Sequence, residues 1–240
     1  SGFQDSHNDS EPSNGSGGLL GRQTLLVFSQ GQNREYYIYV PSTYNPQIPI
    51  PLLISWHGQY LPNTAQWNAE LTRDFWDPTA QQYNFIILAQ AGTDTSTGSW
   101  DPSIDFLIFE DVITQMYQLY NIEKTRIYGH GFSAGGHLMH ALMLDNSLDY
   151  AAYSVSAGTL MSYTGITAPS NSNRILPVFL SIGETDPWHN TVVAEQDYFI
   201  NAGWLENQTY WLDVFNGGHQ LDPQVPVKSW NKMCMFSNLQ

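Results

Sequence analysis

Two continuous apolar runs constrain the fold of this chain more than any other feature. They are IPLLISWHG at 50–58 and NFIILAQAG at 84–92. Apolar runs of this length without alternation are typical of strands that are buried on both faces, as in a parallel sheet. Further strands are predicted at 125–130, 151–158, 175–183 and 209–215.

Helical segments separate these runs. The segment 105–121 places apolar residues at helical spacing, with Asp105 as the expected N-cap, and helices are also predicted at 134–144 and 190–203. The runs 24–30 and 34–41, separated by Gly and Asn, predict an antiparallel hairpin near the start. Strands that alternate with helices indicate the α/β class with a mostly parallel central sheet. We expect one domain over residues 22–240, after a Ser/Gly/Asn/Asp-rich disordered linker at 1–21.

The charge balance excludes several classes of partner. The chain has 240 residues and a formal net charge of -14, from 8 Lys and Arg against 22 Asp and Glu. Nucleic acid and anionic membrane surfaces are therefore not expected as partners. A neutral substrate is expected instead. No run is long and apolar enough to insert into a membrane. The low-complexity start and the low Lys content favour an exported protein, either secreted, periplasmic or at the cell surface. Cys234 is the single cysteine, so no intrachain disulfide is expected.

The segment RIYGHGFSAGGHLMHAL, 126–142, places Ser133 between a predicted strand and a predicted helix. Glycines stand two positions before and two after this serine, where a side chain would collide with the neighbouring element. Such a sharp turn holds the serine Oγ clear of its own backbone. The N–H of Ala134 then lies at a helix N-terminus, where it can donate to a developing oxyanion. These features predict a nucleophilic serine.

A serine nucleophile needs a base and an orienting carboxylate, and both follow in the chain. Asp186 lies just past the strand 175–183, and His219 follows two glycines after the strand 209–215. We expect these two residues to complete a triad with Ser133. Glu184 and His189 are alternatives, and His57, His130, His137 and His140 are expected to have structural roles.

Other residues are predicted to surround the site. The second oxyanion donor is expected to be the backbone N–H of Gln59, with that of Tyr60 as the fallback, because both follow the strand that ends at His57-Gly58. Tyr60, Trp100, Phe132 and Trp188 lie in or near the predicted site loops and are candidate substrate-binding residues, with core or rim packing as the alternative. The histidines do not fall into a spacing such as HExxH, so no metal and no cofactor are expected.

Four blocks of the chain together resemble a known family. REYYIYVPSTYNPQIPIPLLISWHG, the segment from DFLIFEDV to GHGFSAGG, IGETDP and NGGHQLDP are similar to the secreted α/β-hydrolase esterases. The likeness is to the group that joins polyhydroxybutyrate depolymerases with feruloyl and acetylxylan esterases. It implies the α/β-hydrolase fold, the triad Ser133, Asp186 and His219, and an oxyanion hole of the Gln59 and Ala134 amides. Gln59 stands where depolymerases often have a cysteine.

The resemblance implies hydrolysis of carboxylic esters through an acyl-enzyme. The expected substrates are feruloyl or acetyl esters of polysaccharides or small aryl and alkyl esters. A polyester depolymerase, a serine peptidase of the same fold and an inactive carbohydrate-binding module remain alternatives. The partner is thus expected to be a small or polymeric ester, and the sequence predicts no oligomeric state.

Overall fold

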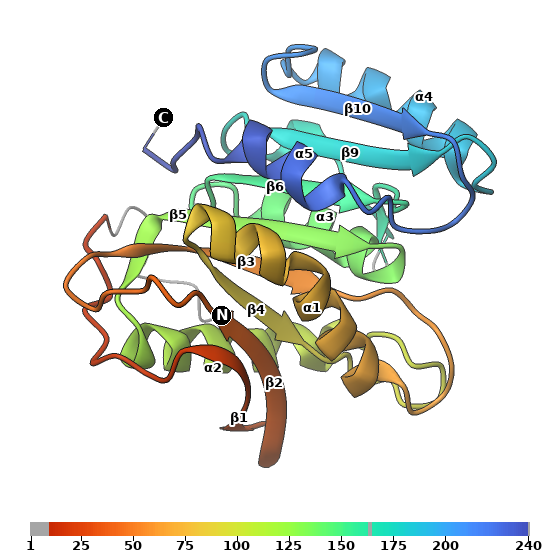
Figure 1. Cartoon of the computed structure of the whole chain (residues 1–240). Helices are drawn as coiled ribbons and strands as arrows, with labels where there is room; N and C mark the ends of the chain where they lie inside the picture. Colours follow the sequence, from red (N-terminus) through yellow and green to blue (C-terminus); the bar gives the residue numbers. More distant parts are fainter. Residues whose placement is uncertain (1–9, 163–164, 240) are drawn as a thin grey trace. The chain divides into compact units, whose positions relative to one another are not determined.

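The structure is a computed structural model that describes residues 10–162 and 165–239. Their contacts divide the chain into two compact units, one from Glu11 to Lys124 and one from Thr125 onward. Each unit combines strands with flanking helices (Figure 1). The expectation of one domain over 22–240 is not tested by this division and stays a prediction.

The first unit contains the predicted hairpin. The strands β1 (Gly21–Ser29) and β2 (Gln32–Val40) pair antiparallel, with Gly21 opposite Val40 and Ser29 opposite Gln32. The two residues between them, Gln30 and Gly31, have φ of 50° and 81°, which is the conformation that a tight hairpin turn requires. The hairpin predicted from the runs 24–30 and 34–41 is confirmed.

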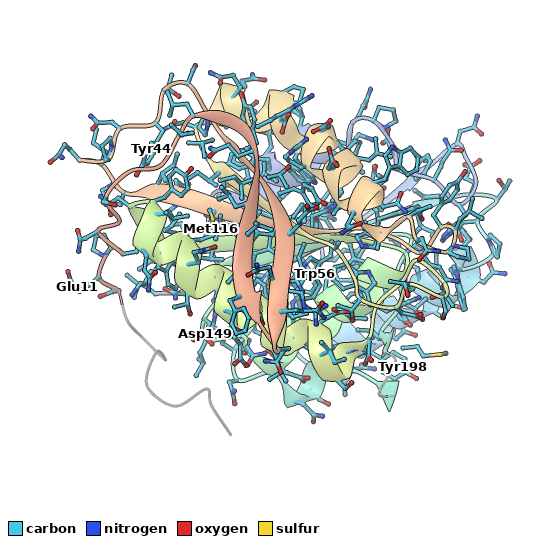
Figure 2. The ribbon with its side chains drawn as sticks, turned by 90° about the horizontal axis from the view of Figure 1, so that it is seen from below. Glu11, Tyr44, Trp56, Met116, Asp149 and Tyr198 are labelled. Carbon is cyan, nitrogen blue, oxygen red and sulfur yellow. The ribbon has the colours of Figure 1, made fainter. Side chains whose placement is uncertain are left out.

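Two fully buried strands continue this unit, in the order β1-β2-β4-β3. The strand β3 (Ile50–Trp56) pairs parallel with β4 (Ile86–Gln90), and β4 pairs antiparallel with β2. Every residue of β3 and β4 is buried, as the continuous apolar runs predicted. Figure 2 shows Trp56 and Met116 among the ribbons of this unit, where both side chains are buried, and Glu11 at its edge.

Two helices cover these strands. Helix α1 (Ala65–Tyr83) contacts β2, β3 and β4, and helix α2 (Pro102–Leu119) contacts β1. The sequence pattern predicted α2 but not α1, which contains Pro78 in its interior. The N-cap expected at Asp105 is wrong. Asp101 caps α2 by accepting from Ser103 N at 3.0 Å, and Asp105 is buried one turn further along the helix.

The segment before β1 belongs to the linker that the sequence predicted at 1–21. Residues 1–9 of the predicted linker lie outside the described residues. The part that is described is held by backbone hydrogen bonds: Ser13 N donates to Ile122 O at 3.0 Å, and Gly17 N donates to Leu119 O at 2.8 Å. A Cβ on Gly15 would overlap the backbone of Tyr120. Small residues let the two chain segments approach closely. The disordered linker expected at 1–21 stays a prediction.

The second unit is a parallel sheet of four strands in the order β5-β6-β9-β10. They are β5 (Ile122–Phe132), β6 (Ala152–Ser156), β9 (Val178–Gly183) and β10 (Tyr210–Phe215). All are paired in parallel, and β6 and β9 are buried throughout. Their carboxyl ends therefore meet at one edge of the sheet, which is where sites form in α/β proteins.

Three helices accompany this sheet. They are α3 (Ala134–Asp145), α4 (His189–Asn201) and α5 (Val225–Met233). Figure 1 shows α5 on one face of the strands and α3 and α4 on the other. Between β6 and β9 the chain forms the short strands β7 (Met161–Ser162) and β8 (Gly165–Ile166) and the 3-10 turn Pro169–Asn171. The predicted strands and the helices at 134–144 and 190–203 are confirmed, whereas α5 was not predicted.

Candidate active site

Ser133 occupies the turn between β5 and α3. The strand ends at Phe132 and the helix begins at Ala134, so a single residue makes the whole turn. Ser133 has φ of 51° and ψ of -117°, a region that costs a non-glycine residue about 1–3 kcal/mol. Its N–H donates to Ser156 O at 2.9 Å, and its carbonyl accepts from His137 N at 3.0 Å. The end of β6 and the first turn of α3 thus hold the strained residue in place.

Two glycines allow the strand and the helix to come this close. A Cβ on Gly131 would collide with the carbonyl group of Gly135 and would lie 2.8 Å from the Cα of Gly136. A Cβ on Gly136 would lie 2.8 Å from Val155 Cγ1 and 3.1 Å from the Cα of Gly158. All three contacts of the Gly131 Cβ, and two of the three of the Gly136 Cβ, are with backbone atoms, which cannot move away as a flexible side chain can. Larger residues at these positions would push the helix away from the sheet.

The loops after β9 and β10 lie against one another. The two strands are parallel neighbours, with Gly183 opposite Phe215. A Cβ on Gly183 would overlap the carbonyl oxygens of Gly217 and Gly218. Thr185 donates to Gly217 O from both its N–H and its hydroxyl, each at 3.0 Å. These contacts bring the loop that carries His219 onto the loop that carries Asp186.

The three predicted triad side chains meet in this unit. His219 Nε2 lies 2.8 Å from Ser133 Oγ, and His219 Nδ1 lies 2.8 Å from Asp186 Oδ2. An ionised carboxylate only accepts hydrogen bonds, so the proton of the neutral imidazole stays on Nδ1. Nε2 is then the atom that can accept the proton of the serine hydroxyl. This is the arrangement of a nucleophile, a general base and an orienting acid.

Asp186 is fixed at both carboxylate oxygens. Its side chain is fully buried, and Oδ1 accepts from Trp188 N at 2.7 Å while Oδ2 binds His219. The alternatives considered from the sequence lie elsewhere. Glu184 is exposed and its N–H pairs with Phe215 O, and His189 Nδ1 lies 3.1 Å from Gly183 O. Neither contacts Ser133 among the described interactions.

The other histidines are packed into the two units. His57 Nδ1 lies 2.8 Å from Gly58 O, and His57 Nε2 accepts from Gly92 N at 3.0 Å. His130 and His140 are completely buried, beside Ser156 and Tyr153 respectively, and burial lowers the pKa of each imidazole to about 3. Burial also lowers the pKa of His57 to about 4. These side chains are therefore neutral at ordinary pH.

His137 is a neighbour of the site that the sequence did not single out as functional. Its Nδ1 lies within 3.1 Å of the N, O and Oγ1 atoms of Thr159, and its ring meets the indole of Trp188 edge to face at 6.0 Å. Burial lowers the pKa of His137, and the nearby His219 lowers it further. His137 therefore links the loop after β6 to Trp188 and, through the Trp188 amide, to Asp186. The only sequence signal was its position one helical turn after Ser133.

Two of the four predicted substrate-binding aromatics lie beside the triad. The Phe132 ring lies 5.4 Å from the His219 ring at an angle of 33°, and Trp188 follows Asp186 with its residue surface 36% exposed. Ala134 is the first residue of α3, where backbone N–H groups have no intrahelical acceptor. Its N–H is thus positioned as the sequence predicted, at the helix N-terminus directly after Ser133.

The remaining predicted residues belong to the first unit. Trp100 is only 2% exposed, stacks on the His57 ring at 4.6 Å and donates from Nε1 to His57 O at 2.9 Å. It supports the loop after β3 from the core, as in the alternative of core packing, and its contact with substrate stays a prediction. Tyr60 is 61% exposed, and Gln59 is exposed in the same loop. The roles of Gln59 and Tyr60 stay predictions.

Within the described ranges, 10–162 and 165–239, no three His, Cys, Asp or Glu side chains gather closely enough to hold a metal ion. None of the helices described there is long and apolar enough to cross a membrane.

Known proteins resemble this chain in sequence and in structure. No family model matches it. The bifunctional acetylxylan esterase/xylanase XynS20E of Neocallimastix patriciarum is 30% identical over 198 residues, which cover 82% of this chain and 26% of that protein. The chain thus corresponds to about a quarter of this relative's length.

Solved structures share the fold at lower identity. A thermostable esterase has a TM-score of 0.68 at 20% identity, covering 89% of this chain and 63% of its own. A ferulic acid esterase has a TM-score of 0.64 at 16% identity, and the match covers 90% of this chain and 98% of the esterase. A dipeptidyl aminopeptidase IV from Bacteroides ovatus has a TM-score of 0.66 at 13% identity, and the match covers 95% of this chain and 36% of the peptidase.

The strand order within each unit, the serine turn and these likenesses agree with one another. The predicted fold is confirmed, and the similarity to esterases supports the expectation of a carboxylic ester hydrolase. This chain has the α/β-hydrolase fold and resembles the esterases that share it.

Proposed function

We propose that this chain is a serine carboxylesterase that removes acetyl or feruloyl groups from plant polysaccharides or from smaller fragments of them. One observation supports it most strongly. His219 Nε2 lies 2.8 Å from Ser133 Oγ, and His219 Nδ1 lies 2.8 Å from Asp186 Oδ2. The serine itself is held in a strained turn at a helix N-terminus. The relative with acetylxylan esterase in its name and the fold neighbour that is a ferulic acid esterase support the substrate class.

The proposed reaction has two steps. Ser133 Oγ attacks the acyl carbon while its proton moves to His219 Nε2, and the imidazolium formed is stabilised by Asp186 at Nδ1. His219 then gives the proton to the leaving alcohol, which leaves an acyl group on Ser133. A water molecule attacks this acyl-enzyme in the second step, with His219 again as the base, and releases the carboxylic acid.

The oxyanion formed in each step needs hydrogen-bond donors. We assign one of them to the N–H of Ala134, because the N-terminal end of α3 carries the positive end of the helix dipole. The other is expected from Gln59 N–H. Removal of one such donor typically lowers kcat by about 10²–10³.

The acyl group is proposed to lie against Phe132 and Trp188. Both belong to the unit that contains the triad, and each lies beside one of its members: Phe132 beside His219 and Trp188 beside Asp186. Aromatic walls suit a feruloyl ring by stacking and leave a smaller acetyl group less tightly held. Export from the cell, expected from the composition, would place the enzyme where such polysaccharides occur.

The test compares wild type with Ser133→Ala on four substrates: p-nitrophenyl acetate, p-nitrophenyl butyrate, methyl ferulate and acetylated xylan. We expect hydrolysis of acetylated xylan or methyl ferulate that is lost in the variant. The Tm of the variant is also measured, because residue 133 lies in a strained turn and a loss of activity must not come from a loss of the fold.

Other results would replace this proposal with an alternative. Hydrolysis of polyhydroxybutyrate films without activity on the polysaccharide esters would indicate a depolymerase. Cleavage of peptide p-nitroanilides in place of esters would indicate a peptidase. Binding of polysaccharide with no turnover of any ester would indicate a carbohydrate-binding module, and activity that survives in Ser133→Ala would exclude the serine mechanism.

A further inference from the structure

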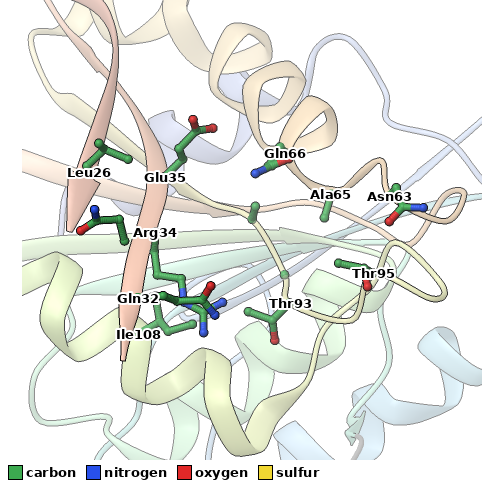
Figure 3. A pocket seen from close by; sticks show the side chains of 13 residues that line it. Leu26, Gln32, Arg34, Glu35, Asn63, Ala65, Gln66, Thr93, Thr95 and Ile108 are labelled. Carbon is green, nitrogen blue, oxygen red and sulfur yellow. The ribbon is translucent and has the colours of Figure 1, made fainter. Parts of the chain in front are cut away.

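A cavity of about 360 Å³ with a mixed polar and apolar lining lies in the unit Glu11–Lys124, and its lining includes none of the residues that the proposed reaction uses (Figure 3). Three segments form most of its walls: the start of β2, the start of α1 and the loop after β4. Leu26 of β1 and Ile108 of α2 add apolar surface. Figure 3 shows the β2 residues on one side and the start of α1 across from them. The polar and charged side chains of the lining include Gln32, Arg34, Glu35, Asn63, Gln66 and Thr93.

The walls are held in shape by contacts of their own. Asn63 N donates to Thr95 O at 2.9 Å, which joins the start of α1 to the loop after β4. A Cβ on Gly98 would overlap Leu61 O, so the same two segments are in close backbone contact. Thr93 N is 3.2 Å from both carboxylate oxygens of Asp105. A ligand would therefore find a preformed site and would not have to order the loop.

The lining is dense in groups that both donate and accept hydrogen bonds. Asn63 and Gln66 are exposed side-chain amides, each with two donor hydrogens and one acceptor oxygen. Gln32 adds a third amide, whose oxygen accepts from both terminal nitrogens of Arg34, at 2.6 and 3.1 Å, in the amide orientation that satisfies both groups. Glu35 supplies a carboxylate, one oxygen of which accepts from Tyr37 OH at 2.9 Å. Hydroxyl groups, which donate and accept at one atom, are the natural partners of such a lining.

Charge and polarity exclude other ligand classes. Among the described residues of the lining, Arg34 carries the single positive charge and Glu35 a negative one, so their formal charges sum to zero. The chain as a whole carries a net charge of -14, so an anion gains little by entering. An apolar ligand would bury the amides without partners, at a cost of about 1–3 kcal/mol for each group. A neutral molecule rich in hydroxyl groups fits best.

The size of the cavity and the residues around it indicate that the neutral ligand is a sugar. The volume of about 360 Å³ lies at the small end of ligand pockets, which span roughly 300–1,000 Å³. Tyr60 and Trp67 flank the segment that supplies Asn63 and Gln66, and both are strongly exposed, at 61% and 53%. Their rings lie 5.9 Å apart at 43°. Exposed aromatic rings offer apolar faces against which the C–H face of a sugar ring can pack.

We propose that this pocket binds one neutral sugar unit of an oligosaccharide or polysaccharide, without chemistry on it. The proposal rests on the proposed function only for the source of the sugar, the carbohydrate part of the ester substrate. It adds a site for carbohydrate that is separate in its residues from the triad and from the aromatic residues assigned to the acyl group.

The experiment is calorimetric titration of the wild-type protein with xylotetraose, which carries no ester and so reports binding without turnover. Two variants remove lining amides: Asn63→Gly, since glycine adopts the φ of 60° that Asn63 has, and Gln66→Ala at the start of α1. Gln82→Ala is the matched control, an exposed glutamine near the other end of the same helix and outside the lining. Each variant is also measured for Tm and for hydrolysis of p-nitrophenyl acetate.

We expect millimolar binding that weakens at least tenfold in the double variant Asn63→Gly/Gln66→Ala and is unchanged in Gln82→Ala. Hydrolysis of p-nitrophenyl acetate should stay unchanged in all of them. Pocket-dependent binding of another neutral tetrasaccharide in place of xylotetraose also supports the proposal. Absence of binding to any neutral oligosaccharide, or binding that the double variant retains, overturns it. Wild type that binds sugar through the pocket yet hydrolyses no ester would overturn the proposed function and leave this inference standing.

Discussion

Replacement of Asp186 by asparagine tests the proposed role of the triad most directly, because the structure fixes what the new amide must do. In the native protein both carboxylate oxygens accept: Oδ1 from Trp188 N at 2.7 Å and Oδ2 from His219 Nδ1 at 2.8 Å. The amide of asparagine has only one acceptor oxygen. If the oxygen faces Trp188 N–H, the amide nitrogen faces His219 Nδ1 and donates to it. The imidazole then carries its proton on Nε2 and cannot accept the proton of Ser133.

The opposite orientation keeps the base but leaves two N–H groups facing each other at Trp188. An unsatisfied buried donor costs about 1–3 kcal/mol, so the amide favours the first orientation by about that amount. A neutral hydrogen bond is also about half as strong as one to a carboxylate, so the imidazolium loses roughly 1–1.5 kcal/mol of stabilisation. Together these amount to about 2–4.5 kcal/mol, or roughly a 30- to 2,000-fold decrease in kcat.

The assay is kcat on p-nitrophenyl acetate for wild type, Asp186→Asn and the control Asp197→Asn, an exposed aspartate on α4. Tm is measured on all three proteins. A decrease of less than tenfold in Asp186→Asn, with Tm unchanged, would refute the proposed role, because it would mean that Asp186 neither selects the tautomer nor stabilises the charge.

Three further predictions concern the turn, a buried acid and the pocket wall. Gly131→Ala places a Cβ against the Gly135 carbonyl and should lower the free energy of unfolding by about 1–3 kcal/mol, measured as a lower Tm. The control Gly218→Ala should leave Tm unchanged, because its Cβ would meet Thr185 Oγ1 at an ordinary 3.6 Å. Burial raises the pKa of Glu195 to about 7, so the native state holds a proton that the unfolded state releases near its usual pKa. The contribution of Glu195 to the free energy of unfolding is therefore complete at low pH and is lost as pH rises toward 7. Glu195→Gln should have a higher Tm than wild type at pH 8 but not at pH 4. Trp188→Ala should raise KM for methyl ferulate more than for p-nitrophenyl acetate. Equal increases would show that Trp188 does not contact the acyl group.

The sequence predicted those parts of the fold that depend on a local pattern. Continuous apolar runs located β3 and β4, because strands buried on both faces have no polar side to alternate with. The glycines around Ser133 located the turn, since only a close backbone approach requires them. Asp186 and His219 followed from their positions just beyond two strand ends, which neighbouring parallel strands bring to the same edge.

The parts that were missed depend on tertiary contacts. Helix α1 buries Ala65, Ala69, Trp76 and Ala80 along one side, yet Pro78 argues against a helix in any local interpretation. Asp105 looked like a helix cap, but the helix begins one turn earlier, and the buried carboxylate instead accepts from Thr93 N and Asp101 N. Trp100 followed a predicted site loop in sequence, and only the structure shows that it turns inward to stack on His57.

The geometry of the triad depends on backbone contacts more than on side chains. His219 is placed by the meeting of two loops, where Gly183 lies against the carbonyls of Gly217 and Gly218 and where Thr185 N donates to Gly217 O. Ser133 is placed by its own N–H to the end of β6. Side-chain replacements around the site can therefore change which acyl group is accepted while the three side chains of the proposed triad keep their distances. A Cβ at Gly183, by contrast, would separate the two loops, and with them His219 from Asp186, without touching any residue that takes part in the proposed reaction.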